Sequence, residues 1–228
     1  MPWYAKSIGS YDRTSNEAIE NANNIYGTLY SRGWTVNAVC GVLGNMGAES
    51  GYNPWRWQGD NVGASTGAPW TNIGYGLVQF TPASKYISDP NAQALSGYAP
   101  NFSDKSGNPS DGYAQTLFFD QYADYYATTS YPLSYADFKQ STESPAYLAR
   151  AWLYNYERPK KPGATEAARA ENAEYWYTVL TGEEPPPDPG PGPGPGPGPG
   201  PGPGPTPELG KGKWWIYMKP KWKRVIGV

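Results

Sequence analysis

Apolar residues recur at helical spacing along the first part of the chain, and this pattern predicts a mainly α-helical domain. One helix is expected after Ser15, whose hydroxyl can cap it, and it should end before Gly33. A second helix is expected after the similar cap Thr35, and Gly51 and Pro54 should end it. Its apolar stripe consists of Val36, Val39, Cys40, Leu43 and Met46. The stripe predicts that Cys40, the single cysteine, is a small buried apolar residue.

Later in the chain, glycine and proline interrupt the pattern more often. Residues 53–75 are rich in Gly, Asn, Pro and Trp and are expected to form loops with a short hairpin. The region 88–111 is expected to be irregular. Further helices are predicted over residues 83–87, 113–126, 145–157 and 165–182. The expected fold class is therefore mainly α, in the α+β sense, with one small hairpin or loop region.

A change of composition divides the chain into three parts. Prolines and glycines alternate through most of residues 183–207, and such a segment is expected to be a disordered, fairly extended spacer. Glycine stands at every second position rather than every third, which excludes a collagen repeat. We therefore predict a globular domain over 1–182, a linker over 183–207 and a short basic, aromatic tail over 208–228.

The tail differs in charge from the domain that precedes the linker. Residues 1–182 hold 12 Lys and Arg against 16 Asp and Glu, a net charge of −4. The tail holds a single acid, Glu208, and its basic residues are Lys211, Lys213, Lys219, Lys221, Lys223 and Arg224. Cations mixed with tryptophans favour an anionic wall polymer or an anionic membrane surface as partner, or docking onto another protein. Nucleic acid is not favoured, because the main domain is acidic.

The chain contains no histidine, and this excludes several kinds of catalyst. Ser-His and Cys-His nucleophiles need the imidazole as a base, and catalytic zinc sites normally use two or three histidine ligands. We therefore expect no metal and no cofactor. An enzyme without histidine is directed toward catalysis by carboxylate groups.

The strongest candidate for such chemistry is Glu49, within the sequence Gly44–Pro54. It falls in the last turn of the second predicted helix, beside Val42 and Met46 at the edge of the apolar stripe. Partial burial and the negative end of the helix dipole both favour the protonated form of a carboxyl group. A general acid needs that form, although the same position also suits an ordinary solvated glutamate.

Two further blocks carry candidate polar groups. In Gly74–Pro82, Gln79 is able to hydrogen-bond a sugar acetamide or fix a water, while the alternative is a buried strand. In Tyr154–Pro159, Glu157 is a possible second carboxylate. The neighbouring Arg158 instead suits a structural ion pair with Glu157, and we favour this structural role.

These blocks together resemble the phage tail lysozyme family. The similar segments are Glu-Ser-Gly-x-Asn-Pro at 49–54, Gly-Leu-Val-Gln-Phe-Thr-Pro at 76–82 and Tyr-Glu-Arg-Pro at 156–159. Residues 33–46 and 174–177 also fit the pattern of this family. Their order agrees over roughly residues 15–181. The resemblance implies a lysozyme-like, mostly helical fold that cleaves the β-1,4 glycan strands of bacterial peptidoglycan, with Glu49 as the general acid.

The resemblance leaves the second catalytic group open. Asp60, in the loop after the acid helix, is the nearest candidate, although Gly-Asp-Asn is also typical of a turn. If Asp60 orients a water molecule, the reaction inverts the configuration at the sugar carbon that is attacked. If Asp60 stabilises the sugar cation, the reaction retains that configuration. If Glu49 works alone, as acid and then as base, the product is an anhydro sugar, as for a lytic transglycosylase. The side chains expected to bind substrate are Ser50, Gln79, Tyr75, Phe80, Trp55, Trp57 and Trp70.

The rival hypothesis of another class is an inert wall-binding or structural module that keeps the fold, but the intact Glu49 motif favours an enzyme. The sequence shows no run of about 20 apolar residues, so no membrane span is expected. The segment 1–6 lacks the features of a secretory signal. We therefore expect a phage-encoded protein that stays in the host cytoplasm until lysis or is carried in the virion tail. In the virion, the tail segment would dock onto a phage structural protein.

Overall fold

The structure is a computed structural model that describes residues 2–6, 8–60, 73–96 and 111–189. Helices dominate the described residues. They are α1 (Asn16–Tyr30), α2 (Val36–Glu49), α3 (Ser84–Ile87), α4 (Pro90–Ser96), α5 (Asp111–Tyr122), α6 (Tyr135–Gln140), α7 (Pro145–Trp152) and α8 (Glu166–Thr181). Short turns of other helix types are η1 (Gln58–Asp60), η3 (Leu153–Glu157) and η4 (Pro162–Ala164). The expectation of a mainly helical fold is confirmed.

The two predicted N-terminal caps are present. The Ala18 amide donates to the Ser15 hydroxyl at 3.2 Å, and the Ala38 amide donates to the Thr35 hydroxyl at 3.1 Å. Each bond satisfies one of the amides that the first turn of a helix leaves without a partner. Local sequence therefore fixes where α1 and α2 begin.

The later elements differ from the prediction in three places. The region expected to be irregular contains α4, which begins at Pro90, a residue that suits the first helical position. The helix α6 was not predicted, because six residues capped by Ser134 show too little periodicity to be recognised. The helix α5 ends at Tyr122 rather than at 126, and the Tyr126 amide instead bonds the Asn155 carbonyl at 3.0 Å.

The expected hairpin is represented only by isolated antiparallel bridges among the described residues. Tyr75 pairs with Trp57 on one side and with Phe80 on the other. The run 74–80 that looked extended is instead a tight loop, in which Gln79 adopts a φ of 47°. Residues 61–72, in the middle of the predicted hairpin region, lie outside the described residues.

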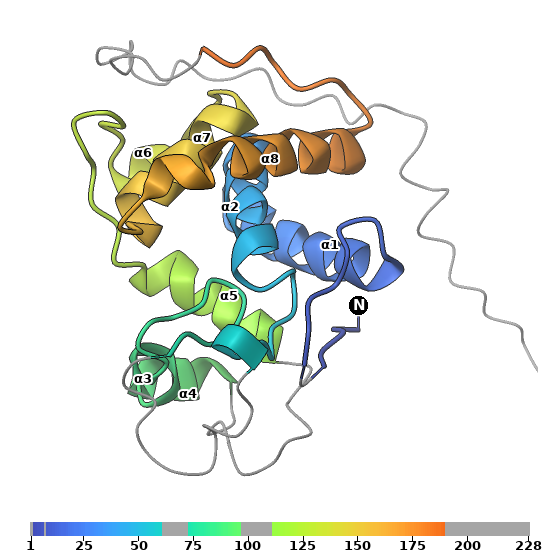
Figure 1. Cartoon of the computed structure of the whole chain (residues 1–228), viewed down its shortest axis with the longest axis vertical. Helices are drawn as coiled ribbons and strands as arrows, with labels where there is room; N and C mark the ends of the chain where they lie inside the picture. The colour runs from blue at the N-terminus through green and yellow to red at the C-terminus, as the bar shows by residue number, and fades with distance from the viewer. Residues whose placement is uncertain (1, 7, 61–72, 97–110, 190–228) are drawn as a thin grey trace, which may run out of the picture. The chain divides into compact units, whose positions relative to one another are not determined.

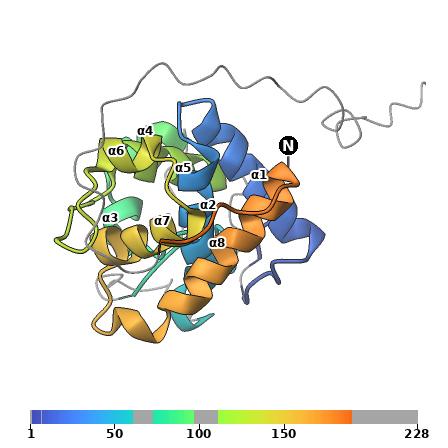
Figure 2. The same ribbon diagram turned by 90° about the horizontal axis from the view of Figure 1, so that it is seen from above.

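The helix α2 occupies the centre of the domain, with α7 and α8 packed against it (Figure 1, Figure 2). Two glycines of α2 permit this close approach. A Cβ atom added to Gly41 would lie 2.8 Å from the Leu148 Cβ on α7. One added to Gly44 would lie 2.8 Å from the Ala173 Cβ on α8 and would also clash with the Arg169 carbonyl oxygen. These distances are too short, so both crossings require glycine.

The loop that follows α2 is tied to α8. Tyr52 is buried, and its hydroxyl accepts a hydrogen bond of 2.8 Å from the Trp176 indole. The two rings meet edge to face with centroids 5.0 Å apart, a favourable arrangement for aromatic pairs. The end of α2 is therefore held against α8, and this fixes the place of Glu49.

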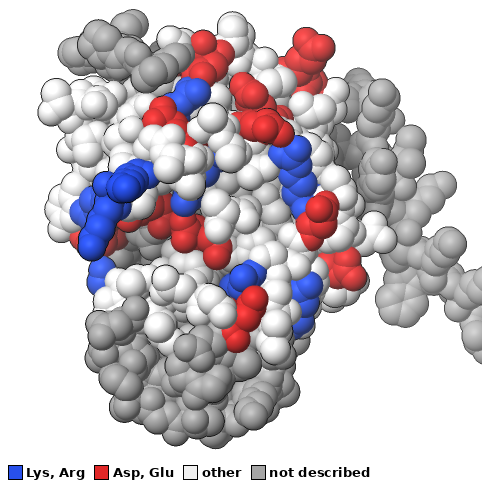
Figure 3. All heavy atoms as spheres, in the orientation of Figure 1, with Lys and Arg blue, Asp and Glu red and all other residues white. Residues whose placement is uncertain are grey.

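The start of the predicted linker is described as far as residue 189. Asp188 accepts a hydrogen bond of 2.5 Å from Arg150 on α7. The tail predicted at 208–228 lies outside the described residues. Among the described helices, none is long and apolar enough to cross a lipid bilayer. Acidic and basic side chains are interspersed on the face shown in Figure 3, consistent with ion pairs such as Arg13–Glu171.

Candidate active site

Glu49 stands at the last position of α2 and forms an ion pair with Arg169 of α8. The Arg169 Nη2 atom lies 2.6 Å from the Glu49 Oε1 atom. The Arg169 side chain is buried, with 7% exposed, whereas 21% of the Glu49 side chain remains exposed. A buried cation therefore holds the partly exposed carboxylate of Glu49 in a fixed orientation.

A second set of bonds fixes the guanidinium. Arg169 Nη1 donates to the Asn45 side-chain oxygen at 2.9 Å, and Nε donates to the Thr165 hydroxyl at 3.2 Å. Asn45 is fully buried, and its amide in turn donates to the Ala149 carbonyl of α7 at 2.9 Å. Three helices are therefore joined through one network, and Arg169 has little freedom to move away from Glu49.

Glu157 is placed in the same neighbourhood by the turn of π-helix that continues α7. Its carboxylate accepts a hydrogen bond of 3.0 Å from the Trp152 indole. Burial raises the pKa of Glu157 well above its ordinary value, and the negative charge of Glu49 raises it further. The Arg169 cation and the Trp152 hydrogen bond act in the opposite direction but do not offset these effects.

Arg158 does not pair with Glu157, although the sequence suggested such an ion pair. Arg158 adopts a left-handed conformation at the end of η3, with a φ of 47°, and pairs with Asp124 at 2.8 Å. The prediction that Arg158 gives Glu157 a structural partner is therefore wrong. The turn at Arg158 directs its side chain to Asp124 and leaves Glu157 near Glu49 and Arg169.

The residue after Glu49 joins the first two sequence blocks. The Ser50 hydroxyl is buried and donates to the Leu77 carbonyl at 2.8 Å. Gln79, two residues further on, is partly exposed, and its amide donates to the carbonyls of Arg56 and Gly76 at 3.0 Å each. The loop 74–80 is thereby fixed beside the end of α2, with Ser50 inside the protein and Gln79 at its edge.

Three of the aromatic residues expected to bind substrate lie inside the protein. Trp57, Tyr75 and Phe80 are at most 5% exposed. Tyr75 packs on Trp57 at 4.7 Å between centroids, and its hydroxyl donates to buried Asp111 at 2.8 Å. Burial raises the pKa of Asp111, although the hydrogen bonds that it accepts lower it. These rings support the loops instead of forming an exposed sugar platform.

Two other candidates have distinct surroundings. Trp55 is partly buried against the core. Asp60 forms an ion pair with Arg56 at 2.8 Å and accepts a hydrogen bond of 2.8 Å from the Gly9 amide. Its carboxylate therefore ties the N-terminal segment to the loop after α2. Trp70 lies outside the described residues.

Sequence reasoning missed Arg169, Asn45 and Trp152 as members of the site. The sequence did contain an indication of Arg169, because this arginine falls on the buried face of α8 together with Ala173 and Trp176. A cation on an apolar stripe needs an anionic partner. Within the described residues, no three acidic or cysteine side chains form a group that could hold a metal ion.

The described residues form a mainly helical domain, which is consistent with a lysozyme-like fold. Residues 20–180 match the phage tail lysozyme family, so this chain belongs to that family. It is also similar to morphogenesis protein 1 of Bacillus phage B103, with 35% identity over 170 residues. That match covers 73% of this chain but only 41% of the length of the phage B103 protein.

Proposed function

We propose that this protein cleaves the β-1,4 glycan strands of bacterial peptidoglycan, and that Glu49 delivers the proton to the leaving oxygen. Membership in the phage tail lysozyme family supports the substrate class. The observation that carries the choice of residue is the pairing of a partly exposed Glu49 with the buried Arg169. An exposed carboxylate with a fixed orientation at a helix end is in a position to meet a substrate.

The charges of the site indicate where that proton resides before reaction. Burial and the nearby negative charge of Glu49 raise the pKa of Glu157 well above its ordinary value, which favours the protonated form of Glu157. In our proposal, Glu157 holds a proton for the site in the resting enzyme, and Glu49 delivers a proton to the glycosidic oxygen.

The fate of the sugar cation distinguishes two reactions. A hydrolase needs a group that activates water or stabilises the cation, and Asp60 was the first candidate. Its carboxylate is engaged by Arg56 and by the Gly9 amide, which favours Glu157 as the second carboxyl. The same observation favours a second candidate function, in which Glu49 acts as acid and then as base. That sequence of steps is a lytic transglycosylase reaction and leaves an anhydro sugar.

The setting we propose is a phage that must open a bacterial wall, either at lysis or from its tail. The name of the similar phage B103 protein, a morphogenesis protein, is consistent with a particle-bound role. The basic tail at 208–228 would then bind an anionic wall polymer, a membrane surface or a phage structural protein.

The test is digestion of purified peptidoglycan by the wild type and by Glu49→Gln, followed by mass spectrometry of the fragments. Glutamine keeps the shape and removes the acid. Glu171→Gln is the matched control, because Glu171 is a 69% exposed glutamate on α8 that also pairs with an arginine. We expect glycosidic cleavage by the wild type and by Glu171→Gln, and none by Glu49→Gln.

The fragment ends identify the reaction. Reducing amino-sugar ends indicate hydrolysis, and anhydro ends indicate transglycosylation. Equal cleavage by wild type and Glu49→Gln would overturn the role of Glu49. Binding without cleavage by all three proteins would favour an inert wall-binding module.

A further inference from the structure

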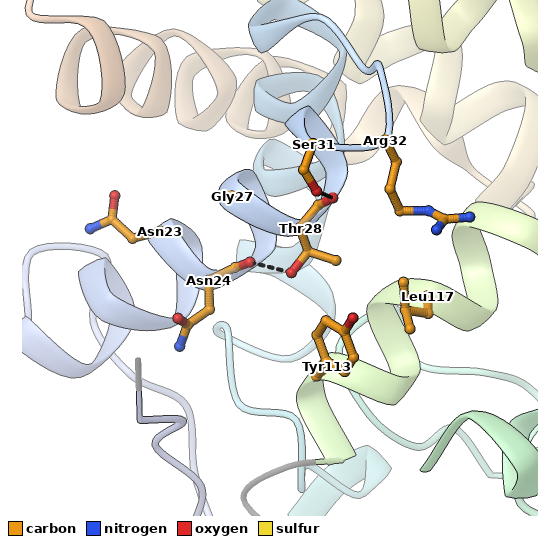
Figure 4. A pocket seen from close by; sticks show the side chains of 8 residues that line it. All are labelled: Asn23, Asn24, Gly27, Thr28, Ser31, Arg32, Tyr113 and Leu117. Carbon is orange, nitrogen blue, oxygen red and sulfur yellow. Dashed lines mark hydrogen bonds between the residues drawn. The ribbon is translucent and has the colours of Figure 1, made fainter. Parts of the chain in front are cut away.

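A hollow of about 360 Å³ lies between α1 and α5, and the site at Glu49 does not account for it (Figure 4). One wall comes from the second half of α1 and carries Asn23, Asn24 and Thr28. The opposite wall comes from α5 and carries Tyr113 and Leu117. In the close-up, Thr28 of α1 and Tyr113 of α5 lie toward one another, while the Asn23 side chain points away from α5 (Figure 4).

A glycine in the interior of α1 lines this hollow without any packing reason. A Cβ atom added to Gly27 would meet no heavy atom within 4 Å, in contrast to Gly41 and Gly44 of α2. Glycine inside a helix destabilises it relative to alanine. No packing contact of the described protein offsets this cost. The bare backbone keeps one side of the hollow open, which points to a ligand that approaches it.

The groups around the hollow are mostly neutral and polar. Asn23 and Asn24 offer amides, Thr28 a hydroxyl and Tyr113 a ring that is 48% exposed. The Asn24 amide nitrogen donates to the Pro2 carbonyl at 2.8 Å, and the side-chain oxygen of an asparagine is able to accept hydrogen bonds. Amides that donate and accept, together with an exposed amphipathic ring, match a ligand with hydroxyl and acetamido groups and an apolar face.

Arg32, the cation among the described lining residues, does not change this preference. Arg32 is already paired with Asp120, which Lys139 also contacts at 3.3 Å. The charge of Arg32 is therefore compensated within the protein. Among the lining residues that the structure describes, an anionic polymer would find no uncompensated cation, whereas a neutral sugar needs none.

We propose that the hollow between α1 and α5 is a second saccharide-binding site, which takes an N-acetylated sugar unit of a glycan strand. The end of the hollow formed by Ser31 and Arg32 lies away from Glu49, because these two residues lie just before α2, whereas Glu49 is the last residue of α2. A helix of 14 residues is about 20 Å long. The site would give the enzyme a second point of attachment to its polymer. Such an attachment raises the effective concentration of glycan at the site of Glu49.

The choice of a glycan as ligand rests on the proposed function, but the site can be tested separately. The probe is a soluble β-1,4-linked oligomer of N-acetylglucosamine, added to the full chain carrying Glu49→Gln so that nothing is cleaved. Binding is followed by calorimetry and by the NMR signals of backbone and asparagine side-chain amides. We expect one set of signals to shift around Asn23, Asn24 and Tyr113.

The blocking variant is Gly27→Leu, whose side chain fills the hollow from a position where its Cβ meets nothing. Gly27→Ala is the matched control, since it changes the helix backbone in the same way without filling the space. We expect Gly27→Leu to remove the shifts at α1 and α5 and to weaken binding to insoluble peptidoglycan by at least about 10-fold. Gly27→Ala, which adds a single methyl group, should weaken binding much less than Gly27→Leu does.

Cleavage assays separate this proposal from the proposed function. In the Glu49-intact chain, Gly27→Leu should cut a short soluble fragment at the wild-type rate. If the parent gives no shifts at α1 and α5, or if Gly27→Leu retains them, the second site is overturned whatever the outcome at Glu49. Equal binding of an unacetylated glucose oligomer would overturn the assignment of an N-acetylated ligand. A third outcome is that Gly27→Leu loses binding while the wild type does not cleave peptidoglycan. This result would support the second site and contradict the proposed function.

Discussion

Glu49 and Arg169 are 120 positions apart in sequence, and their side chains form a 2.6 Å ion pair that joins the end of α2 to the first turns of α8. The arginine is the more deeply buried partner and is held by Asn45. Removing one partner of a buried pair leaves an uncompensated charge, at a cost of about 3–5 kcal/mol. The pair therefore links the stability of the helix junction to the orientation of the proposed catalytic group.

Replacing Arg169 by lysine should separate charge from geometry. Lysine keeps the positive charge but lacks the planar fork of donors through which Arg169 bonds Asn45 and Glu49. A misplacement of about 1 Å can cost about 100-fold in rate, so we expect kcat/KM on peptidoglycan to fall by about that factor. Circular dichroism and KM are measured alongside. A Lys variant that is folded and fully active would show that the fork of bonds is dispensable.

Glu157→Gln should change how stability depends on pH. Because the folded state raises the pKa of Glu157, it keeps this proton to higher pH than the unfolded chain, whose value is about 4.3. The bound proton contributes to the free energy of unfolding of the wild type, and this contribution is lost as pH rises from about 4 through the pKa of Glu157 in the folded state. Glutamine does not ionise, so the stability of the variant relative to wild type should grow over that range.

Urea unfolding at several pH values measures this difference. Glu171→Gln serves as the control, since it makes the same exchange at an exposed glutamate. A constant difference for Glu157→Gln would show that Glu157 is ionised in the folded protein. Activity of the variant above neutral pH then reports whether the stored proton is used.

Gly44→Ala should destabilise the protein, whereas Gly27→Ala should not. The new methyl group at position 44 would clash with the Arg169 carbonyl oxygen and meet the Ala173 Cβ at 2.8 Å, and both belong to the helix α8. Overpacking of this kind costs about 1–3 kcal/mol. At position 27 the methyl group meets nothing, and we expect a gain of about 0.5–1 kcal/mol from helix propensity. The measurement is the urea concentration at the midpoint of unfolding for both variants. Similar midpoints would contradict the predicted difference in stability.

Cys40 should be unreactive in the folded protein. It is 0% exposed, and burial raises the pKa of its thiol, so the reactive thiolate is disfavoured. Treatment with dithionitrobenzoate should release no colour from the native chain and one equivalent in concentrated denaturant. Rapid reaction under native conditions would mean that α2 opens locally.

Deleting residues 190–228 should affect binding more than catalysis. The tail carries six basic residues and one acid, so its attraction to an anionic wall polymer should weaken as salt is raised. We expect a chain that ends at residue 189 to cut a soluble glycan at the wild-type rate and to bind teichoic-acid-bearing walls less tightly at low salt. Unchanged binding at low salt would exclude this role for the tail.

The sequence alone determined the features that depend on neighbouring residues. The caps at Ser15 and Thr35, the placement of Glu49 at the end of a helix and the burial of Cys40 all follow from spacing within a few residues. The absence of histidine, a matter of composition, directed the expected chemistry toward carboxylates. The quoted motifs also identified the family correctly.

Tertiary structure decided which partners these residues meet. Arg169 joins Glu49 across 120 positions, Arg158 turns to Asp124 instead of Glu157, and Tyr75 is buried on Asp111. Helical periodicity specifies only which face of a helix is buried, not which helix covers it. The crossings at Gly41 and Gly44 bring α7 and α8 onto α2, and only this packing places Glu157 and Arg169 beside Glu49.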